Sequence, residues 1–183
     1  TYFENINFHT PQIIDIRWDN TCNLACNYCM PYFSSVWASI KKEYQTPPKN
    51  NDGVIEYLKE KSSDIEYAIL LGGEPFLQKK NLELLNIISQ ETALFFVTNL
   101  SFGLIEDNPI FKKLLEVERK VAFGISFETI HERFEYVRHN AEWEVLLSNI
   151  KVLKKYYPQK IMSQPLYCLY SAFNLVEYYD FIN

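Results

Sequence analysis

The sequence has no long hydrophobic run, no block of Lys and Arg, and no signal-peptide pattern in its first residues. No apolar run approaches the roughly 18 to 20 residues that are needed to cross a bilayer. The first residues lack the charged and apolar regions of a signal peptide. The net charge is −5, so a sequence-independent grip on nucleic-acid backbones is not expected. These absences favour a cytoplasmic protein that binds neither membranes nor nucleic acid.

The size of the chain fits one domain. It has 183 residues, of which 48% are hydrophobic, and this is enough to bury a sizeable core. The sequence begins without methionine and ends in a pattern that is typical of a helix. We therefore expect residues 1–183 to form one core domain of a longer protein, incomplete at its carboxyl end.

Three of the four cysteines lie within eight residues, at the spacing CxxxCxxC: Cys22, Cys26 and Cys29. Cysteines clustered in a chain without export signals are typical of metal sites rather than disulfides. No fourth cysteine or histidine lies nearby in the sequence, whereas a structural zinc site normally closes with four protein ligands. Thiolates also hold iron–sulfur clusters. A cubane bound by these three cysteines would keep one iron open to a non-protein ligand.

Apolar patterns predict strands that alternate with helices. Strands are expected at residues 13–18, 67–71, 94–98, 121–126 and 165–170. Helices are expected at residues 33–44, with Val36, Ile40 and Trp37 facing inward, and at 54–58, 82–88, 111–115 and 143–153. Asn108 is expected to cap the fourth of these five. The alternation indicates an α/β fold with a parallel sheet. No GxGxxG follows the first strand, which favours an incomplete TIM-type barrel of five βα units over a doubly wound sheet.

Functional groups collect at the carboxyl ends of strands in parallel barrels. Gly72, Gly73 and Glu74 end the second predicted strand. A glycine pair permits close backbone approach and positive φ, and a buried glutamate beside it could take a cationic partner; a plain tight turn is the alternative. Ser126 and Glu128 end the fourth strand on one face, where they could bond adjacent hydroxyls of a ribose.

With Tyr28 as its aromatic residue, the cysteine segment resembles the CxxxCxΦC signature of the radical SAM (S-adenosylmethionine) superfamily. The segment from Gly72 to Glu74 resembles the GGE segment of that family, and the resemblance covers nearly the whole chain. It implies a six-unit partial barrel, whose sixth unit is missing here. It also implies a 4Fe-4S cluster that reductively cleaves S-adenosylmethionine, giving a 5′-deoxyadenosyl radical that abstracts hydrogen from a substrate.

The resemblance also assigns roles to single residues. The GGE segment would contact the amino group of S-adenosylmethionine. Asn99 would follow the family's threonine-asparagine pattern at the end of the third strand, and a plain turn toward the next helix is the alternative. Ser126 and Glu128 would contact the ribose, although the family often has aspartate where this chain has the longer Glu128. Tyr28 would form part of the wall beside the adenine of S-adenosylmethionine.

Arg138 resembles an arginine of twitch-type members that pairs with the carboxylate of S-adenosylmethionine, since its planar fork suits carboxylates. The alternative for Arg138 is a solvated charge at a helix end. Cys168, in the fifth predicted strand, is either a small buried side chain or a thiol that returns hydrogen to a substrate radical, as in epimerases of the superfamily.

The sequence leaves the substrate and the class of protein open. The leading prediction is an enzyme that acts on a peptide or a small molecule and receives electrons from a protein such as flavodoxin or ferredoxin. A non-catalytic iron–sulfur electron-transfer protein would also need the cluster but not the GGE segment. A zinc-stabilised binding module would need Cys168 or a histidine to fold back over the cysteine loop.

Overall fold

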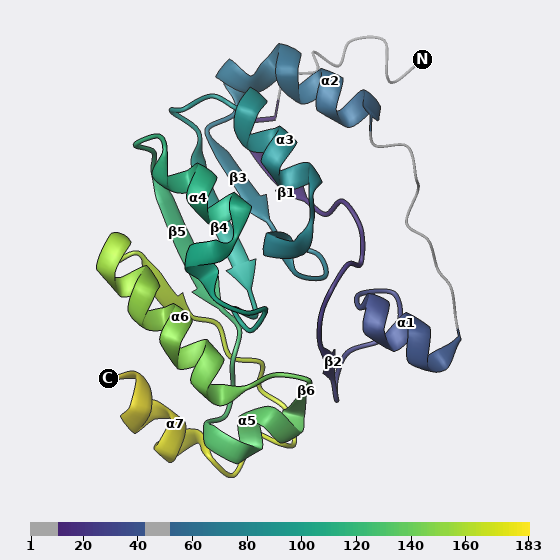
Figure 1. The fold of residues 1–183 in the computed structure, drawn as a ribbon, viewed down its shortest axis with the longest axis vertical. Helices are drawn as coiled ribbons and strands as arrows, with labels where there is room; N and C mark the ends of the chain where they lie inside the picture. The colour runs from purple at the N-terminus through teal and green to yellow at the C-terminus, as the bar shows by residue number, and fades with distance from the viewer. Residues whose placement is uncertain (1–10, 43–51) are drawn as a thin grey trace, which may run out of the picture.

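A computed structural model describes residues 11–42 and 52–183 of the chain. Five parallel strands form the main sheet in the order β1-β3-β4-β5-β7 (Figure 1). These strands are β1 (Ile13–Ile16), β3 (Tyr67–Leu70), β4 (Ala93–Thr98), β5 (Val121–Ile125) and β7 (Ile161–Ser163). Because parallel neighbours need crossover connections, helices lie between them in the sequence: α2 (Asp52–Lys61), α3 (Lys80–Ile87), α4 (Pro109–Leu115) and α6 (Trp143–Tyr156).

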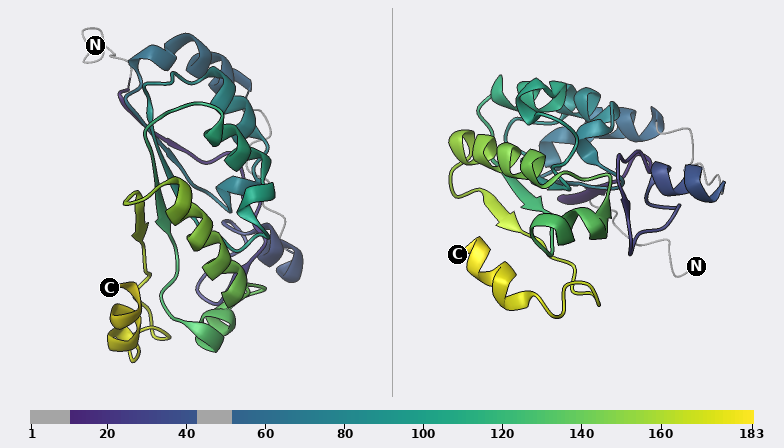
Figure 2. Two further views of the ribbon diagram at one scale, coloured as in Figure 1. Left: turned by 60° about the vertical axis from the view of Figure 1, so that its left-hand side comes forward. Right: turned by 60° about the horizontal axis from the view of Figure 1, so that its bottom comes forward.

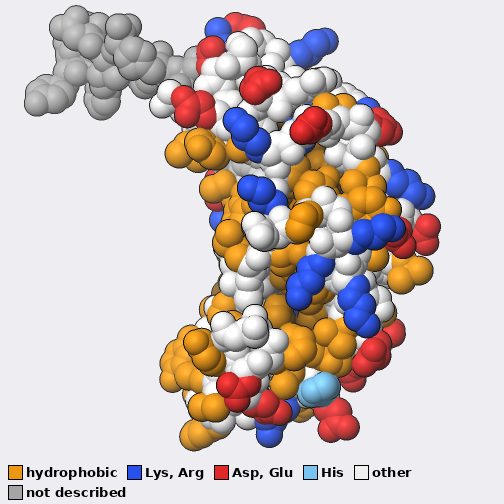
Figure 3. Space-filling view, turned by 90° about the vertical axis from the view of Figure 1, so that its left-hand side faces the viewer, with side chains coloured by type: hydrophobic (Ala, Val, Ile, Leu, Met, Phe, Trp, Pro, Cys, Tyr) orange, Lys and Arg blue, Asp and Glu red, His pale blue; other side chains and the backbone are white. Residues whose placement is uncertain are grey.

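These four helices cover one face of the sheet (Figure 2). Alternate strand residues point toward them, and Leu70, Phe96 and Phe123 are fully buried there. The ring of Phe76 stacks on that of Phe96 with 5.0 Å between centroids. Burial of each such side chain contributes roughly 1.5–3 kcal/mol. The molecule is curved, and its hollow side faces away from the helical layer (Figure 3).

Smaller elements gather at the carboxyl ends of the strands (Figure 1). Two-residue strands β2 (Ala25–Cys26) and β6 (Arg138–His139) pair antiparallel, so Cys26 lies opposite Arg138. The other elements at these ends are α1 (Ser35–Lys41), α5 (His131–Val137), α7 (Leu175–Ile182) and the 3-10 turns η2 (Pro75–Leu77) and η3 (Ile105–Asp107). A further 3-10 turn, η1 (Ser62–Asp64), lies at the amino end of β3. In the part of the chain that the structure describes, no helix has the length and apolar character needed to span a membrane.

The structure confirms the predicted α/β fold, a partial barrel with a parallel sheet of five strands. The predicted cap of α4 is also confirmed, since the Asn108 side chain accepts hydrogen bonds from the backbone N–H groups of Ile110 and Phe111 at 2.9 and 3.3 Å.

Two local predictions are wrong. The fifth strand is Ile161–Ser163 and not residues 165–170, because Pro165 has no N–H to donate and the chain then turns, with the carbonyl of Cys168 accepting from Ser171 N. In α1 the buried residue is Ala38, while Ile40 is 54% exposed. Lys42, at φ 55°, caps this helix, and the last two residues predicted for it lie outside the described ranges.

Candidate functional site

The start of α1 holds the cysteine loop. The hydroxyl of Ser35 accepts a hydrogen bond from Cys22 N at 3.1 Å and donates to the Cys22 carbonyl at 3.0 Å. The indole N–H of Trp37 donates to the carbonyl of Cys26 at 2.8 Å. Sequence reasoning missed the role of Ser35, and it treated Trp37 only as a residue that faces inward. The helix thus fixes the backbone at two of the three cysteines.

The three loop thiols are partly withdrawn from water. Burial raises the pKa of the Cys22 thiol to about 12. Burial also raises the pKa values of Cys26 and Cys29, and the positive charge of Arg138 opposes both increases. The thiols are therefore protonated at neutral pH, and a bound metal would displace these protons, since the thiolate is the ligand form.

Asn99, at the end of β4, lies against the cysteine loop and is 7% exposed. Its Nδ2 donates to the Cys22 sulfur at 3.8 Å and to Asn23 Oδ1 at 3.1 Å. Its Oδ1 accepts from Ser101 N at 2.8 Å, which fixes the orientation of the amide. The end of β4, the third predicted strand, therefore contacts Cys22, which is a candidate metal ligand.

The glycine pair after β3 brings two backbones together. A Cβ on Gly73 would lie 2.1 Å from the carbonyl oxygen of Thr21, and Gly72 has φ +87°. The backbone N–H of Glu74 donates to the same Thr21 oxygen at 2.7 Å. Only glycine permits this approach, so the pair fixes the position of the cysteine loop relative to the sheet.

Replacing Gly73 by alanine should break this contact. The Thr21 carbonyl is backbone and cannot swing away, so we expect a loss of at least about 2 kcal/mol in the free energy of unfolding, together with weaker iron binding. Urea unfolding measures the first effect. Gly53→Ala is the matched control, because Gly53 lies in α2 with no atom within 4 Å of an added Cβ. It should stabilise the helix by about 0.5–1 kcal/mol. If Gly73→Ala and Gly53→Ala changed the free energy of unfolding equally, the close contact between Gly73 and Thr21 would not matter for stability.

Glu74 is fully buried, and neutral donors surround its carboxylate. Oε1 accepts from the Thr98 hydroxyl at 2.7 Å and from Phe76 N at 3.2 Å, and Oε2 accepts from Asn99 N at 2.8 Å. Burial raises the pKa of this carboxyl to about 7, while the three donors oppose the increase. The Glu74 side chain therefore links the end of β3 to the end of β4 through neutral donors. The sequence had suggested a cationic partner for this glutamate instead.

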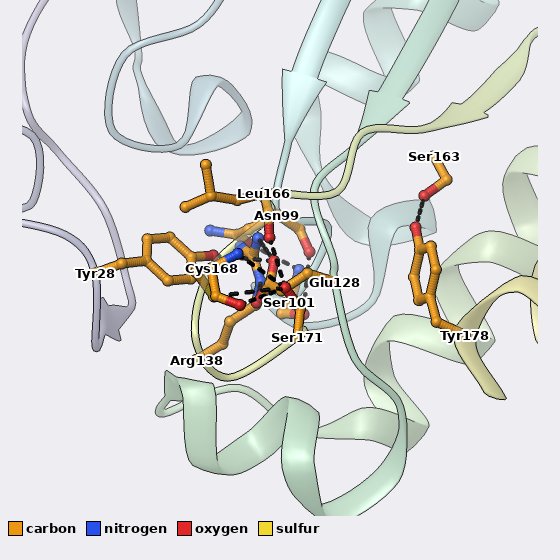
Figure 4. Close-up of polar contacts among 10 residues, drawn as sticks. All are labelled: Tyr28, Asn99, Ser101, Glu128, Arg138, Ser163, Leu166, Cys168, Ser171 and Tyr178. Atoms are coloured by element: carbon orange, nitrogen blue, oxygen red, sulfur yellow. Dashed lines mark hydrogen bonds and ion pairs between the residues drawn. The ribbon is translucent and has the colours of Figure 1, made fainter. Parts of the chain in front are cut away.

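Tyr28, Glu128 and Arg138 form a buried network (Figure 4). Arg138 donates from Nη2 to Glu128 Oε2 at 2.7 Å and from Nε to Oε1 at 3.2 Å. The Tyr28 hydroxyl donates to Glu128 Oε2 at 3.1 Å, and its ring lies 5.6 Å from the guanidinium carbon. Arg138 is only 5% exposed, so the alternative of a solvated charge is wrong.

The electrostatics of this network keep Arg138 charged. Burial alone would lower the pKa of the guanidinium, but the Glu128 carboxylate beside it raises that pKa above the ordinary value. Burial also raises the pKa of the Tyr28 hydroxyl, which therefore remains a hydrogen-bond donor. The network joins the cysteine loop, the segment after β5 and β6.

The remaining predicted residues lie at the same edge of the sheet. Ser126 directly follows β5, where it is half-buried and its N–H donates to the carbonyl of Thr98 at 2.8 Å. Cys168 lies in a turn after β7, not in a strand, and its sulfur accepts from the Ser171 hydroxyl at 3.7 Å. Cys168 is half-buried, so its description as a small buried strand residue is wrong.

A family model, that of the radical SAM superfamily, matches residues 18–167. The chain belongs to this superfamily. This range begins just before the cysteine loop and includes every predicted site residue except Cys168. The match does not separate twitch-type members from other radical SAM proteins.

Solved structures and one curated protein resemble the chain. Native anSMEcpe with bound AdoMet superposes with a TM-score of 0.63 at 18% identity, over 92% of this chain and 49% of that one. Streptococcus suis SuiB superposes with a TM-score of 0.64 at 14% identity, over 93% and 36%. The 7-carboxy-7-deazaguanine synthase of Clostridium acetobutylicum is 36% identical over 73 residues, which are 40% of this chain and 30% of that protein. The chain thus spans half or less of each.

The donor set of this radical SAM chain fits a 4Fe-4S cluster. All three loop cysteines are free thiols, and the Cys22 sulfur accepts hydrogen bonds from Leu24 N at 3.5 Å and from Asn99, as sulfurs of cluster ligands do. Among residues 11–42 and 52–183, no three His, Cys, Asp or Glu side chains come close enough to share one metal ion. A zinc module needs such convergence, whereas each thiolate of a cubane binds a different iron.

Proposed function

We propose that residues 1–183 form the core domain of a radical SAM enzyme, in which Cys22, Cys26 and Cys29 hold a 4Fe-4S cluster with one iron open. The observation that carries this proposal is the meeting of the cysteine loop with the glycine pair and the buried Glu128–Arg138 pair at one edge of the sheet. When bound, the cluster and S-adenosylmethionine supply a one-electron reductive cleavage that generates a 5′-deoxyadenosyl radical.

The protein's own residues bind and orient the cosubstrate. Gly72 and Gly73 hold their segment against the cysteine loop, and we assign the contact with the amino group of the cosubstrate to the segment from Gly72 to Glu74. Ser126 and Glu128 face its ribose. Arg138 uses Nε and Nη2 for Glu128, so Nη1 is the nitrogen that we assign to the carboxylate of S-adenosylmethionine.

The remaining site residues lie in the cysteine loop or hold the segments around it in place. Tyr28 forms part of the wall beside the adenine, and Asn99 holds the sulfur of Cys22 by a hydrogen bond. Glu74 acts by fixing the backbone that carries the glycine pair, since its own oxygens are occupied by protein donors.

The substrate that we propose is a peptide or a small molecule. The short match to a protein named for the synthesis of a carboxylated deazaguanine supports a small molecule. The negative net charge of the chain is consistent with either class and disfavours nucleic acid. Flavodoxin or ferredoxin is the reductant that we propose, and Cys168 remains a candidate hydrogen donor to a substrate radical.

Anaerobic reconstitution with iron and sulfide tests the proposal. We expect about four irons per chain, since a cubane contains that number, broad brown absorbance, and 5′-deoxyadenosine formation when S-adenosylmethionine and a reductant are added. Brown protein that forms no 5′-deoxyadenosine would indicate an electron-transfer protein. Colourless protein with stoichiometric zinc would indicate a binding module and overturn the proposal.

A further inference from the structure

A large cavity lies at the end of the barrel opposite the cysteine loop. Its volume is about 1130 Å³, which is enough for a small-molecule ligand. The starts of β1, β3, β4 and β5 and the chain after α4 and α6 line it. Because the cysteine loop lies at the carboxyl ends of the same strands, this cavity is separate from the radical SAM site.

Most of the cavity wall is apolar, and much of that apolar surface is open. Ile13 is 62% exposed, Tyr67 52%, Leu115 42% and Tyr156 40%. Figure 3 faces this side of the molecule, where apolar side chains line a hollow with Lys and Arg side chains around it. A cluster of exposed apolar groups around a concave surface is typical of a binding site rather than of ordinary surface.

The cavity wall carries one more positive than negative charge although the chain is acidic. Its cations are Arg119, Lys120 and Lys160, and its anions are Glu91 and Glu118. The Nη1 atom of Arg119 is buried and has no hydrogen-bond partner among the described residues. A buried donor without an acceptor is unfavourable. A small movement of the Arg119 side chain toward the cavity would let a ligand acceptor reach Nη1 and stabilise this guanidinium.

We propose that this cavity binds a small amphipathic carboxylate. The apolar body of the ligand lies against Tyr67 and Tyr156, and its carboxylate pairs with the guanidinium of Arg119. Arginine suits this role because its planar donor fork matches the two oxygens of a carboxylate. The proposal does not depend on the function proposed for the cysteine loop, which lies at the other end of the strands.

A matched pair of fluorescent probes tests the proposal: 1-pyrenebutyrate carries the carboxylate, and 1-pyrenebutanol replaces it with a neutral hydroxyl. Anisotropy titrations of the 183-residue chain should show about tenfold tighter binding of 1-pyrenebutyrate, the difference expected for one charged hydrogen-bonded pair. Arg119→Gln should abolish this preference, whereas Arg119→Lys should retain part of it. Tyr67→Ser should weaken both probes equally, because it removes apolar wall and no charge.

Arg133→Gln is the control for the loss of one positive charge. Arg133 is an exposed residue of α5 that pairs with Glu177 at 2.6 Å, far from the cavity, and its replacement should leave the preference unchanged. Equal binding of the two probes by the unaltered chain would overturn the proposal. So would a preference that survives Arg119→Gln, or one that Arg133→Gln abolishes to the same extent. The comparison on the unaltered chain decides the question even if Arg119→Gln does not fold.

Discussion

The Cys26→Ala variant is expected to lose the iron–sulfur cluster, and with it the cleavage of S-adenosylmethionine. Without this thiolate, a second iron of a three-cysteine cubane lacks a protein ligand, and no other cysteine of the loop can replace it. We expect 5′-deoxyadenosine formation to fall by about a thousandfold or more, equivalent to about 4 kcal/mol or more in the activation barrier. Iron and sulfide analysis after reconstitution gives an independent measurement of cluster loss.

The variant should still fold. Cys26 contributes its backbone to the pairing of β2 with β6 and its carbonyl to Trp37, and alanine keeps both. The matched control is Cys168→Ala, which removes the one cysteine outside the loop. It should retain the cluster and 5′-deoxyadenosine formation. Cluster loss in Cys168→Ala, or a full cluster in Cys26→Ala, would contradict the assignment of the ligands.

The Cys168 control also tests its proposed role as a hydrogen donor. If this thiol returns hydrogen to a substrate radical, Cys168→Ala should form 5′-deoxyadenosine but lose turnover to product. The Ser171 hydroxyl that bonds its sulfur would then orient the thiol. Full turnover in the variant would remove Cys168 from the mechanism.

The features predictable from the sequence are those that depend on neighbouring residues. The strand at Tyr67–Leu70 is a short apolar run that ends in glycines, and such a run is typical of a buried parallel strand. The Asn108 cap and Pro109 start of α4 follow local backbone rules. The spacing of the cysteines indicates their chemistry for the same reason, since a short loop brings the three thiols together in any fold.

Features that depend on distant parts of the chain could not be predicted. Leu166, Tyr167 and Leu169 have the composition of a strand, but they are exposed. The last hydrogen bond from this part of the chain to β5 comes before them, where Gln164 N donates to the carbonyl of Ile125. Nothing local in the sequence shows that Arg138 pairs with Glu128 or that β6 lies opposite Cys26. Both facts depend on how α5 folds back on the cysteine loop, which is a tertiary contact.

Replacing Arg138 by methionine should be the most destabilising substitution away from the metal ligands. The substitution leaves Glu128, which is 1% exposed, as a buried carboxylate without its cation, and this costs about 3–5 kcal/mol. Urea unfolding of the unreconstituted chain measures the loss. The matched control is Arg133→Met, because Arg133 and Glu177 form an ion pair with side chains 56% and 50% exposed. That exposed pair should contribute less than about 1 kcal/mol.

The double variant Arg138→Met/Glu128→Leu separates the two roles of the pair. With both charges replaced by apolar groups, most of the lost stability should return, because a well-packed apolar pair can replace a buried ion pair. Affinity for S-adenosylmethionine should not return, because the two replaced residues are those that we assign to its carboxylate and its ribose. Recovery of both properties would make the pair a purely structural clamp between the cysteine loop and the barrel. If Arg138→Met were no less stable than Arg133→Met, the pair would have no structural role either, because a structural ion pair must stabilise the fold.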